Sequence, residues 1–553
     1  MSKIIFVSII MKKNGISRKT GAFVSCSICF FDYNCGYRIE KRGFTMSSSS
    51  IFIILAIVVY LVGMILIGYR HSKGTNNSSD FYLGGRKLGP VVAAMSTEAS
   101  DMSAYLLMGV PGLALFCGVA EAGWTAIGLA AGTYLNWLLV ARRLRTYSAK
   151  VDAITVPDFL ARRFRDNTKL IETIGALVII IFFVPYTASG FVACGKLFNS
   201  MFGWDYVPTM IVSAIVIVAY CTMGGFMAAS ITSLIQSLVM TFALVVVLIF
   251  GISAAGGWDA VMANAKTIPG YLSFTANTNI LADAPGKYGF LAIFSTLSWG
   301  FGYFGMPHVL IHFMAAKDAS NIKTSRRIAT IWVVVSLTVA VIIGIVGFGM
   351  VNAGVIEGFG SSSEAESILV RASAAMSQKN VFFAIIAGII LAGILSATMS
   401  TADVQLLAAA SGITQNLLLD VFGVKLDDKK NLLIARLGVI CIAVIAVFFA
   451  LNPNSSIFRV VSFAWAGFGA TFGPVMLFAL FWKRCNKYGA IAGMLSGAVM
   501  IFVWKFAVRP LGGAWDLYEL LPAFIVGCIM IVFVSLLTKA PDDEIVREFE
   551  SVN

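Results

Sequence analysis

The chain has 553 residues, of which 58% are hydrophobic and 12% are charged, and its formal net charge is +13. A mean hydropathy of +0.86 is too high for a water-soluble globular protein. The positive charge does not indicate nucleic-acid binding, because Lys and Arg gather in short loops between long apolar runs, as in polytopic membrane proteins. Composition therefore predicts an all-α protein embedded in the lipid bilayer.

Residues 1–45 form a basic N-terminal extension that we expect to lie outside the functional core. Their apolar run, IIFVSII, is too short to span a bilayer and lacks the pattern of a secretory signal peptide. The pair Cys26 and Cys29 has no second pair or His nearby, so it is weak as a metal or redox motif. We expect residues 46–538 to form the transmembrane domain and residues 539–553 a charged cytoplasmic tail.

About thirteen apolar runs of membrane-spanning length follow Met46. In chain order they are residues 51–69, 88–113, 119–140, 171–193, 207–220, 234–255, 290–314, 328–351, 381–413, 432–451, 461–482, 490–506 and 521–537. Basic residues concentrate in alternate loops, which the positive-inside rule places in the cytoplasm. We therefore expect a multi-pass protein of the cell membrane with its N-terminus outside and its C-terminus in the cytoplasm.

Two of these runs are interrupted by polar, Gly and Pro residues. The second contains STEASDMS ahead of Gly109 and Pro111, and the seventh reads TLSWGFGYFGMPH. If each of these two runs begins a unit of five helices, the second unit has the opposite orientation in the membrane, because five is an odd number. Broken helices at matching positions of two such inverted units indicate the substrate site of a transporter. The alternative is that these residues only kink the helices for packing.

Polar and aromatic side chains accompany the interruptions. The ninth run contains Ser396, Ser400 and Thr401, and hydroxyl oxygens of this kind suit Na⁺ better than a transition metal. Trp299 and Tyr303 in the seventh run are four residues apart, so they share a helical face that could wall off an apolar ring. A single Ser or Thr can equally well bond to its own helix backbone.

Seven segments carry a resemblance to a known family: LGGRKLGP, ASDMSAYLLMGVPG, AIGLAAGTYLNW, VPDFLARRF, WGFGYFGMPH, SATMSTADVQLL and SFAWAGFGATFGPV. They resemble the sodium/solute symporter family and, within it, the sodium/proline symporters. The resemblance implies a LeuT-type fold with thirteen helices and a five-helix inverted repeat. It implies a transporter, not an enzyme, that takes up L-proline or a similar small zwitterion with Na⁺ by alternating access. It also implies a monomer without an organic cofactor or a nucleic-acid partner.

The resemblance further implies two sets of site residues. The Na⁺ ligands would be the backbone carbonyls of Ala99, Met102 and Ala397 and the hydroxyls of Ser400 and Thr401, and Asp101 would be important for sodium. The substrate would face Ser103, Ala104, Tyr105, Tyr186, Trp299, Tyr303 and Pro307. His308 is expected to pack or to form hydrogen bonds, and not to relay protons.

Four positions depart from the family's pattern. Ala104 and Tyr105 stand where relatives often have Gly and Trp, and Ser233 stands where many have an aspartate linked to cation passage. Glu98 replaces a small residue. We expect Glu98 to add a second intramembrane carboxylate that modulates cation affinity, and an unchanged sodium dependence in Glu98→Gly would count against this.

Two alternatives to proline transport stay open at this point. The cargo could be another small amino acid, a carboxylate or a vitamin. A protein of a different class, a channel or a non-transporting sensor, would be favoured by a soluble signalling domain, and we expect none after residue 537. An embedded enzyme is disfavoured, because the sequence lacks a clustered set of His, carboxylate or nucleophilic residues.

Overall fold

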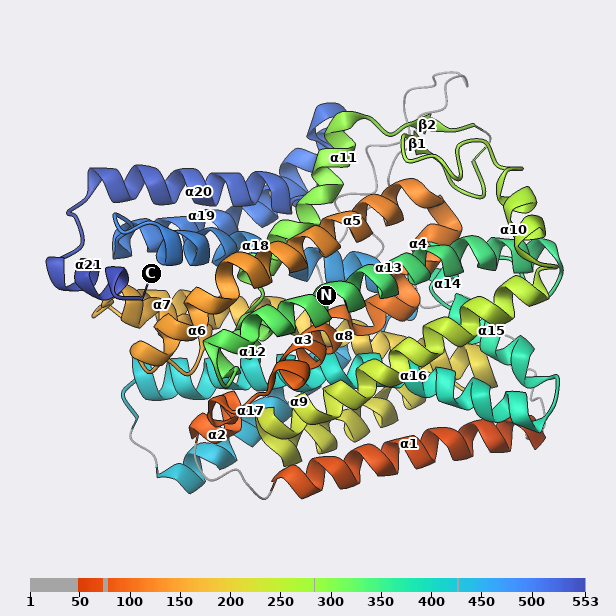
Figure 1. The fold of residues 1–553 in the computed structure, drawn as a ribbon, viewed down its shortest axis with the longest axis horizontal. Helices are drawn as coiled ribbons and strands as arrows, with labels where there is room; N and C mark the ends of the chain where they lie inside the picture. The colour runs from red at the N-terminus through yellow and green to blue at the C-terminus, as the bar shows by residue number, and fades with distance from the viewer. Residues whose placement is uncertain (1–47, 73–77, 283, 425–426, 553) are drawn as a thin grey trace, which may run out of the picture. The chain divides into compact units, whose positions relative to one another are not determined.

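The computed structural model describes residues 48–72, 78–282, 284–424 and 427–552, so the predicted N-terminal extension with Cys26 and Cys29 lies outside the described residues. The described chain is almost entirely helical (Figure 1). Its strands β1 (Ala276–Asn277) and β2 (Gly286–Lys287) pair antiparallel in the loop before the seventh apolar run. The all-α class predicted from composition is therefore confirmed.

The α-helices are α1 (Ser48–Ser72), α2 (Ser78–Leu83), α3 (Pro90–Ala104), α4 (Val110–Cys117), α5 (Val119–Leu135), α6 (Ala141–Lys150), α7 (Val156–Phe164), α8 (Leu170–Phe202), α9 (Tyr206–Ala254), α10 (Trp258–Ala265), α11 (Phe290–Leu297), α12 (Pro307–Ala315), α13 (Ile322–Asn352), α14 (Ser362–Ala365), α15 (Ile368–Ser377), α16 (Val381–Ser411), α17 (Asp428–Phe449), α18 (Ile457–Phe481), α19 (Lys487–Val503), α20 (Leu520–Leu537) and α21 (Asp543–Glu550). Wider π-helical turns form η2 (Tyr105–Gly109), η3 (Asn136–Val140), η6 (Gly412–Val421) and η7 (Trp504–Val508). Tighter 3₁₀ turns form η1 (Gly84–Arg86), η4 (Ser298–Gly305), η5 (Ala319–Asn321), η8 (Arg509–Leu511) and η9 (Gly513–Trp515).

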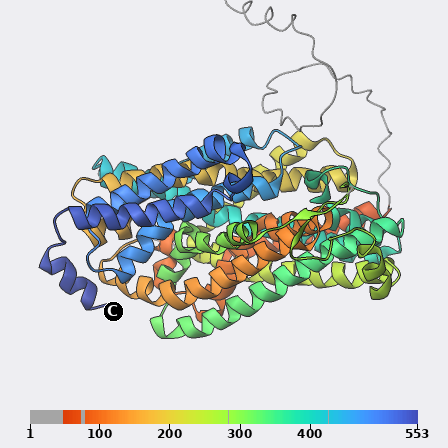
Figure 2. The ribbon, with the colours of Figure 1, turned by 90° about the horizontal axis from the view of Figure 1, so that it is seen from above.

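Eleven helical segments within the described residues are long and apolar enough to cross a membrane. Two shorter apolar segments, Tyr206–Ala219 and Phe290–Gly305, coincide with the fifth and seventh predicted runs. Together these segments match the thirteen runs read from the sequence. The long helices lie side by side in both views of the structure (Figures 1 and 2).

The fifth and sixth runs differ from the prediction, because no loop separates them. Helix α9 continues through both and turns out of helical geometry only at Gly225, whose φ is 63°. The segment GGFMAASITS lies between the two predicted runs, and its hydroxyls bond to carbonyls of their own helix: Ser230 donates to Phe226 over 2.8 Å and Thr232 to Ala228 over 3.0 Å. Such back-bonding lets Ser and Thr lie within an apolar helix.

Helices α3 and α16 form the centre of the transmembrane domain. Helix α16 packs against α1, α3, α8 and α9, and α3 packs against α9, α12, α13 and α16. Every residue of 93–104 is buried, and so is every residue of 390–411. The polar residues predicted from the second and ninth runs therefore lie away from lipid, as intramembrane polar groups require.

Glycine lets the seventh run approach the third closely. A Cβ atom on Gly132 in α5 would lie 2.4 Å from the carbonyl oxygen of Gly300 in η4. A Cβ atom on Gly302 would lie 1.9 Å from Nε1 of Trp465 in α18. Because no other residue fits these gaps without displacing the backbone or the indole, the glycines fix η4 between α5 and α18.

The charged tail contains a short helix, α21, that contacts α7. The Phe549 ring lies 5.0 Å from the Arg163 guanidinium, and Glu544 pairs with Arg165. The guanidinium of Arg163 is fully buried beneath this contact. The tail therefore packs on the transmembrane domain through one cation–π contact and exposed ion pairs.

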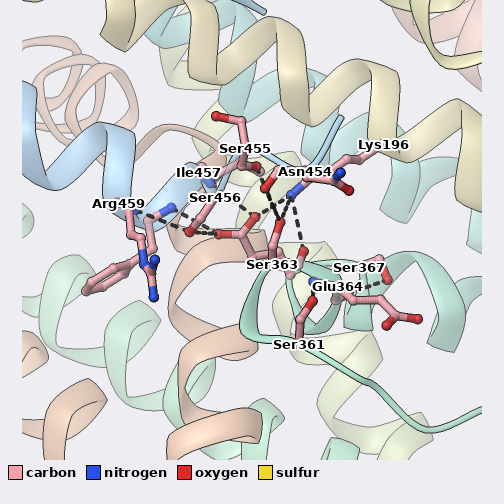
Figure 3. A network of polar contacts seen from close by, with 12 residues as sticks. Lys196, Ser361, Ser363, Glu364, Ser367, Asn454, Ser455, Ser456, Ile457 and Arg459 are labelled. Carbon is pink, nitrogen blue, oxygen red and sulfur yellow. Dashed lines mark hydrogen bonds and ion pairs between the residues drawn. The ribbon is translucent and has the colours of Figure 1, made fainter. Parts of the chain in front are cut away.

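A buried ion pair fastens one end of α18 to α8 (Figure 3). The Glu366 carboxylate lies 2.7 Å from the Lys196 ammonium, and it accepts hydrogen bonds from the Ser456 hydroxyl over 2.8 Å and from the backbone N–H groups of Ile457 and Phe458 over 3.1 and 3.0 Å. Glu366 thus satisfies the free amides at the first turn of α18 and neutralises the positive end of its dipole. The pair joins the α14–α15 region, α8 and α18.

Replacing Lys196 by Met should lower the thermal stability of the purified protein sharply. The Glu366 side chain is 1% exposed, and leaving such a charge unpaired costs about 3–5 kcal/mol. The apparent melting temperature in detergent measures the effect. The matched control is Lys483→Met, which breaks an exposed pair with Glu550 and should cost less than about 1 kcal/mol. Equal melting temperatures for the two variants would contradict this role of Lys196.

Candidate substrate and cation site

Helix α3 is broken inside the STEASDMS segment, where the sequence predicts an interruption. Ser103 has φ 49° and ψ −168°, a conformation outside the helical region that L-residues rarely adopt. Its hydroxyl oxygen accepts a hydrogen bond from the backbone N–H of Tyr105 over 3.1 Å. The side chain of Ser103 therefore caps the helical turns of η2 that follow the break.

Four of the five carried-over Na⁺ ligands lie together between α3 and α16. The Ser400 hydroxyl donates to the Ala99 carbonyl oxygen over 2.8 Å and to the Ala397 carbonyl oxygen over 3.2 Å. The Thr401 hydroxyl donates to the same Ala397 oxygen over 3.1 Å. The fifth, the Met102 carbonyl, accepts the N–H of Tyr105. All five residues are buried.

The side chain of Asp101 faces the seventh run. Its Oδ2 accepts a hydrogen bond from the Tyr303 hydroxyl over 2.6 Å, and its Oδ1 lies 3.8 Å from Nε2 of His308. The Tyr186 hydroxyl in α8 donates to the Asp101 backbone carbonyl over 3.1 Å. Asp101 therefore connects α3 with α8, η4 and α12.

A group of stacked aromatic rings covers the break in α3. The ring centroids of Tyr105 and Trp299 are 5.5 Å apart, and Phe458 from α18 lies 5.5 Å from each of them. Trp299 also stacks on Tyr518 at 5.1 Å. Sequence reasoning found Tyr105 and Trp299, but it missed Phe458 and Tyr518, which stand outside any motif.

The seventh run is broken as the sequence predicts. Helix α11 passes into η4, Met306 is extended with ψ 109°, and Pro307 then begins α12. The Trp465 indole N–H donates to the Trp299 carbonyl over 2.8 Å and so satisfies a backbone group in the irregular stretch. Ala104 and Pro307 are both buried beside the breaks.

The two histidines of α12 contribute packing and one hydrogen-bonding contact. The His308 ring lies 5.7 Å from the Phe183 ring and 6.1 Å from the Tyr186 ring. Nδ1 of His312 lies 2.7 Å from the His308 carbonyl oxygen. The His312 ring packs at 4.8 Å on Phe226.

Relative to the family's pattern, this chain gains an acid at Glu98 and lacks one at Ser233, and both residues are buried. Oε1 of Glu98 accepts a hydrogen bond from the Trp137 indole N–H over 2.9 Å. Oε2 of Glu98 and Oγ of Ser233 have no hydrogen-bond partner among the described residues. Glu98 lies on the side of α3 that faces η3, whereas Ala99 contacts α16.

A polar cavity of 1080 Å³ lies beside the Lys196–Glu366 pair. Its lining includes Lys196, Glu364 and Arg371, and Arg371 pairs with Glu364. Burial raises the pKa of Glu364, but the Gly360 N–H and the Arg371 guanidinium outweigh it and hold this pKa below its ordinary value. The cavity therefore carries paired charges of both signs near neutral pH.

Comparison with known sequences identifies the family. Residues 81–497 match the model of the Sodium:solute symporter family. The osmoregulated proline transporter OpuE of Bacillus subtilis (strain 168) is 40% identical over 494 residues, which cover 89% of this chain and 96% of that protein. The sodium/proline symporter of Escherichia coli (strain K12) is 40% identical over 492 residues, which cover 89% and 94%.

Solved structures agree on the fold. A Na⁺-coupled sialic acid symporter, in a substrate-bound outward-open state, superposes with a TM-score of 0.73 at 16% identity and covers 89% of this chain and 99% of its own. MhsT in complex with L-phenylalanine superposes with a TM-score of 0.51 at 14% identity, covering 80% and 98%. The predicted LeuT-type fold is thus confirmed, and the chain belongs to the sodium:solute symporter family of membrane transporters.

Proposed function

We propose that this protein takes up L-proline together with Na⁺ by alternating access. The observation that carries the proposal is the contact between the Ser400 hydroxyl and the Ala99 carbonyl oxygen, which brings oxygen ligands of two helices together beside a break in α3. The substrate is inferred from relatives at 40% identity that are named as proline transporters. Na⁺ is the coupling ion in this proposal, and no organic cofactor takes part.

The proposed Na⁺ site lies between α3 and α16. The carbonyls of Ala99, Met102 and Ala397 and the hydroxyls of Ser400 and Thr401 would replace the hydration shell of the ion, because such hard oxygens suit alkali cations. The hydroxyls now donate to the Ala99 and Ala397 carbonyls, and they would rotate to present their lone pairs to Na⁺. Na⁺ binding would then tie the two helices together.

The proposed substrate site adjoins the cation site at Ser103. The turns after the break present backbone N–H groups that favour an anionic group, and the carboxylate of proline would bind there. Tyr105 and Trp299 would cover the apolar ring, while Tyr186, Tyr303, Ala104 and Pro307 complete the wall. Tyr105 and Ala104 alter this pocket relative to the family's pattern, so another small zwitterion is the second candidate cargo.

The proposed mechanism uses the ion to select one conformation. Na⁺ would bind more tightly to the state in which α3 and α16 approach, and only such differential affinity shifts a conformational equilibrium. Moving one positive charge inward supplies about 2.3 kcal/mol per 100 mV of membrane potential, to which the Na⁺ gradient adds. We propose that the monomer is the working unit, with its N-terminus outside and its C-terminal tail in the cytoplasm.

Proteoliposomes that contain the purified protein should accumulate labelled L-proline when an inward Na⁺ gradient is imposed, and not without it. The double substitution Ser400→Ala and Thr401→Ala should abolish accumulation, because it removes both hydroxyl ligands. The matched control is Ser411→Ala on the same helix, whose hydroxyl bonds only to the Ala408 carbonyl and whose loss should leave uptake unchanged. Sodium-driven uptake of another solute without proline uptake would contradict the assignment of L-proline as the substrate. Flux of proline only down its own gradient would indicate a channel.

Replacing Tyr105 by Leu should raise the KM for proline by about tenfold, the equivalent of about 1.4 kcal/mol of ring contact. The half-saturating Na⁺ concentration should change much less, since Tyr105 offers no ligand to the proposed Na⁺ site. Initial uptake rates at varied proline and at varied Na⁺ separate the two effects. A Tyr105→Leu variant with an unchanged KM would remove Tyr105 from the substrate wall.

A further inference from the structure

Tyr518, two positions ahead of α20, joins three elements around the break in the seventh run. Its backbone N–H donates to the Ser295 hydroxyl oxygen in α11 over 2.7 Å, and its own hydroxyl donates to the Ser462 carbonyl oxygen in α18 over 2.7 Å. Its ring stacks on Trp299 of η4, with 5.1 Å between the centroids and 21° between the planes. Tyr518 is 7% exposed, so these contacts are made in the interior of the protein.

Helix α20 packs on both the seventh and the eleventh runs. In the repeat predicted from the sequence, the twelfth and thirteenth runs follow the two units of five helices and belong to neither of them. They form α19 and α20. The Phe524 ring of α20 stacks on Phe301 of η4 at 5.1 Å, and a Cβ atom on Gly473 of α18 would lie 2.7 Å from the same ring. A helix from outside the two units therefore connects η4 with α18.

Buried ion pairs hold the start of α20 in place. The Glu519 side chain is 0% exposed, and its two oxygens lie 2.9 Å from the Lys505 ammonium and 3.0 Å from the Arg509 guanidinium. Arg509 also pairs with Asp516 over 2.8 Å. A buried carboxylate that lost these partners would be left uncompensated, which is costly. The ion pairs therefore constrain the segment that ends in Glu519, and with it the adjacent Tyr518.

The position of the Trp299 ring depends on Tyr518. The Trp299 centroid lies 5.5 Å from those of Tyr105 and Phe458, in addition to the stack on Tyr518. Trp299 and Tyr105 are buried, so the ring group is closed to solvent in this conformation. If α18 moved away from η4, Tyr518 would lose either its bond to Ser462 or its stack on Trp299. These two elements cannot separate without breaking a contact of Tyr518.

We propose that Tyr518 is a positioning residue that closes the substrate pocket, because it holds Trp299 over the pocket and fastens α18 to η4. The inference rests on the proposed function, since alternating access requires the pocket to open and close. The bond between the Tyr518 hydroxyl and Ser462 then breaks and re-forms in each cycle, and it favours the closed state over the open one. Helices α19 and α20 thereby take part in closing the pocket.

Dissociation of labelled L-proline from the detergent-purified protein in NaCl, chased with unlabelled proline, measures how often the pocket opens. Tyr518→Phe keeps the ring and removes only the bond to Ser462. It should raise the dissociation rate about fivefold, as expected for the loss of one net hydrogen bond. Tyr518→Leu also removes the stack on Trp299, so it should raise the rate further and weaken equilibrium proline binding.

The matched control is Tyr206→Phe, which also removes a tyrosine hydroxyl that donates to a carbonyl at a helix end, that of Ala450. Its dissociation rate should equal that of the wild type. Ser295→Ala removes the other hydrogen bond of Tyr518 and should also speed dissociation, so this variant decides if Tyr518→Phe does not fold.

The outcomes separate this inference from the proposed function. If the wild type binds proline and Tyr518→Phe releases it at the wild-type rate, the role of Tyr518 is overturned and the proposed function stands. An equal rise in rate in Tyr206→Phe would show a general loosening of the fold and would also overturn the role of Tyr518. No proline binding by the wild type overturns the proposed function and this inference together.

Discussion

The hydrogen bond from Ser400 to the Ala99 carbonyl oxygen is the contact on which the proposed transport cycle depends. It links α16 to α3 at the last turn before the break, four residues ahead of Ser103. The break itself is a strained conformation for serine, costing about 1–3 kcal/mol, and such strain persists only where the surroundings hold it. Here the Ser103 hydroxyl, the Tyr186 hydroxyl and the packed wall of α16 hold it.

Helix α3 brings separate chemical functions together because its faces contact different elements. One face places Ala99 against α16, another turns Glu98 and Asp101 toward η3 and η4, and its broken end lies under the Tyr105 and Trp299 rings. A movement of α16 or of η4 therefore alters every group on α3 at once. Ion and substrate can be coupled through this short helix without a long chain of intermediate contacts.

The sequence predicted the features that depend on local chemistry. Long apolar runs located the spans, and clustered hydroxyls with Gly and Pro located both broken helices. The prediction failed where tertiary contacts decide the outcome. Ser230 and Thr232 lie between the fifth and sixth predicted runs, but back-bonding keeps them inside α9. Phe458 and Glu366 were missed because nothing adjacent in sequence marks them; each acquires its role only when α18 packs beside α3 and α8.

In the candidate site, the role of Trp137 could not be predicted for the same reason, because it depends on a tertiary contact. Its contact with Glu98 joins residues 39 positions apart and depends on the π-turn of η3. Trp465 could have been found, because it is a large residue among small ones in AWAG, a pattern typical of close helix packing.

The most direct test of the account is the affinity of the detergent-purified protein for L-proline, measured by calorimetry in NaCl and in equimolar choline chloride. If Na⁺ joins α3 to α16 and so shapes the pocket, proline should bind at least about tenfold more tightly in NaCl, within the usual range of coupling between sites. Equal affinities in the two salts would contradict the claim that the cation and substrate sites are coupled through α3.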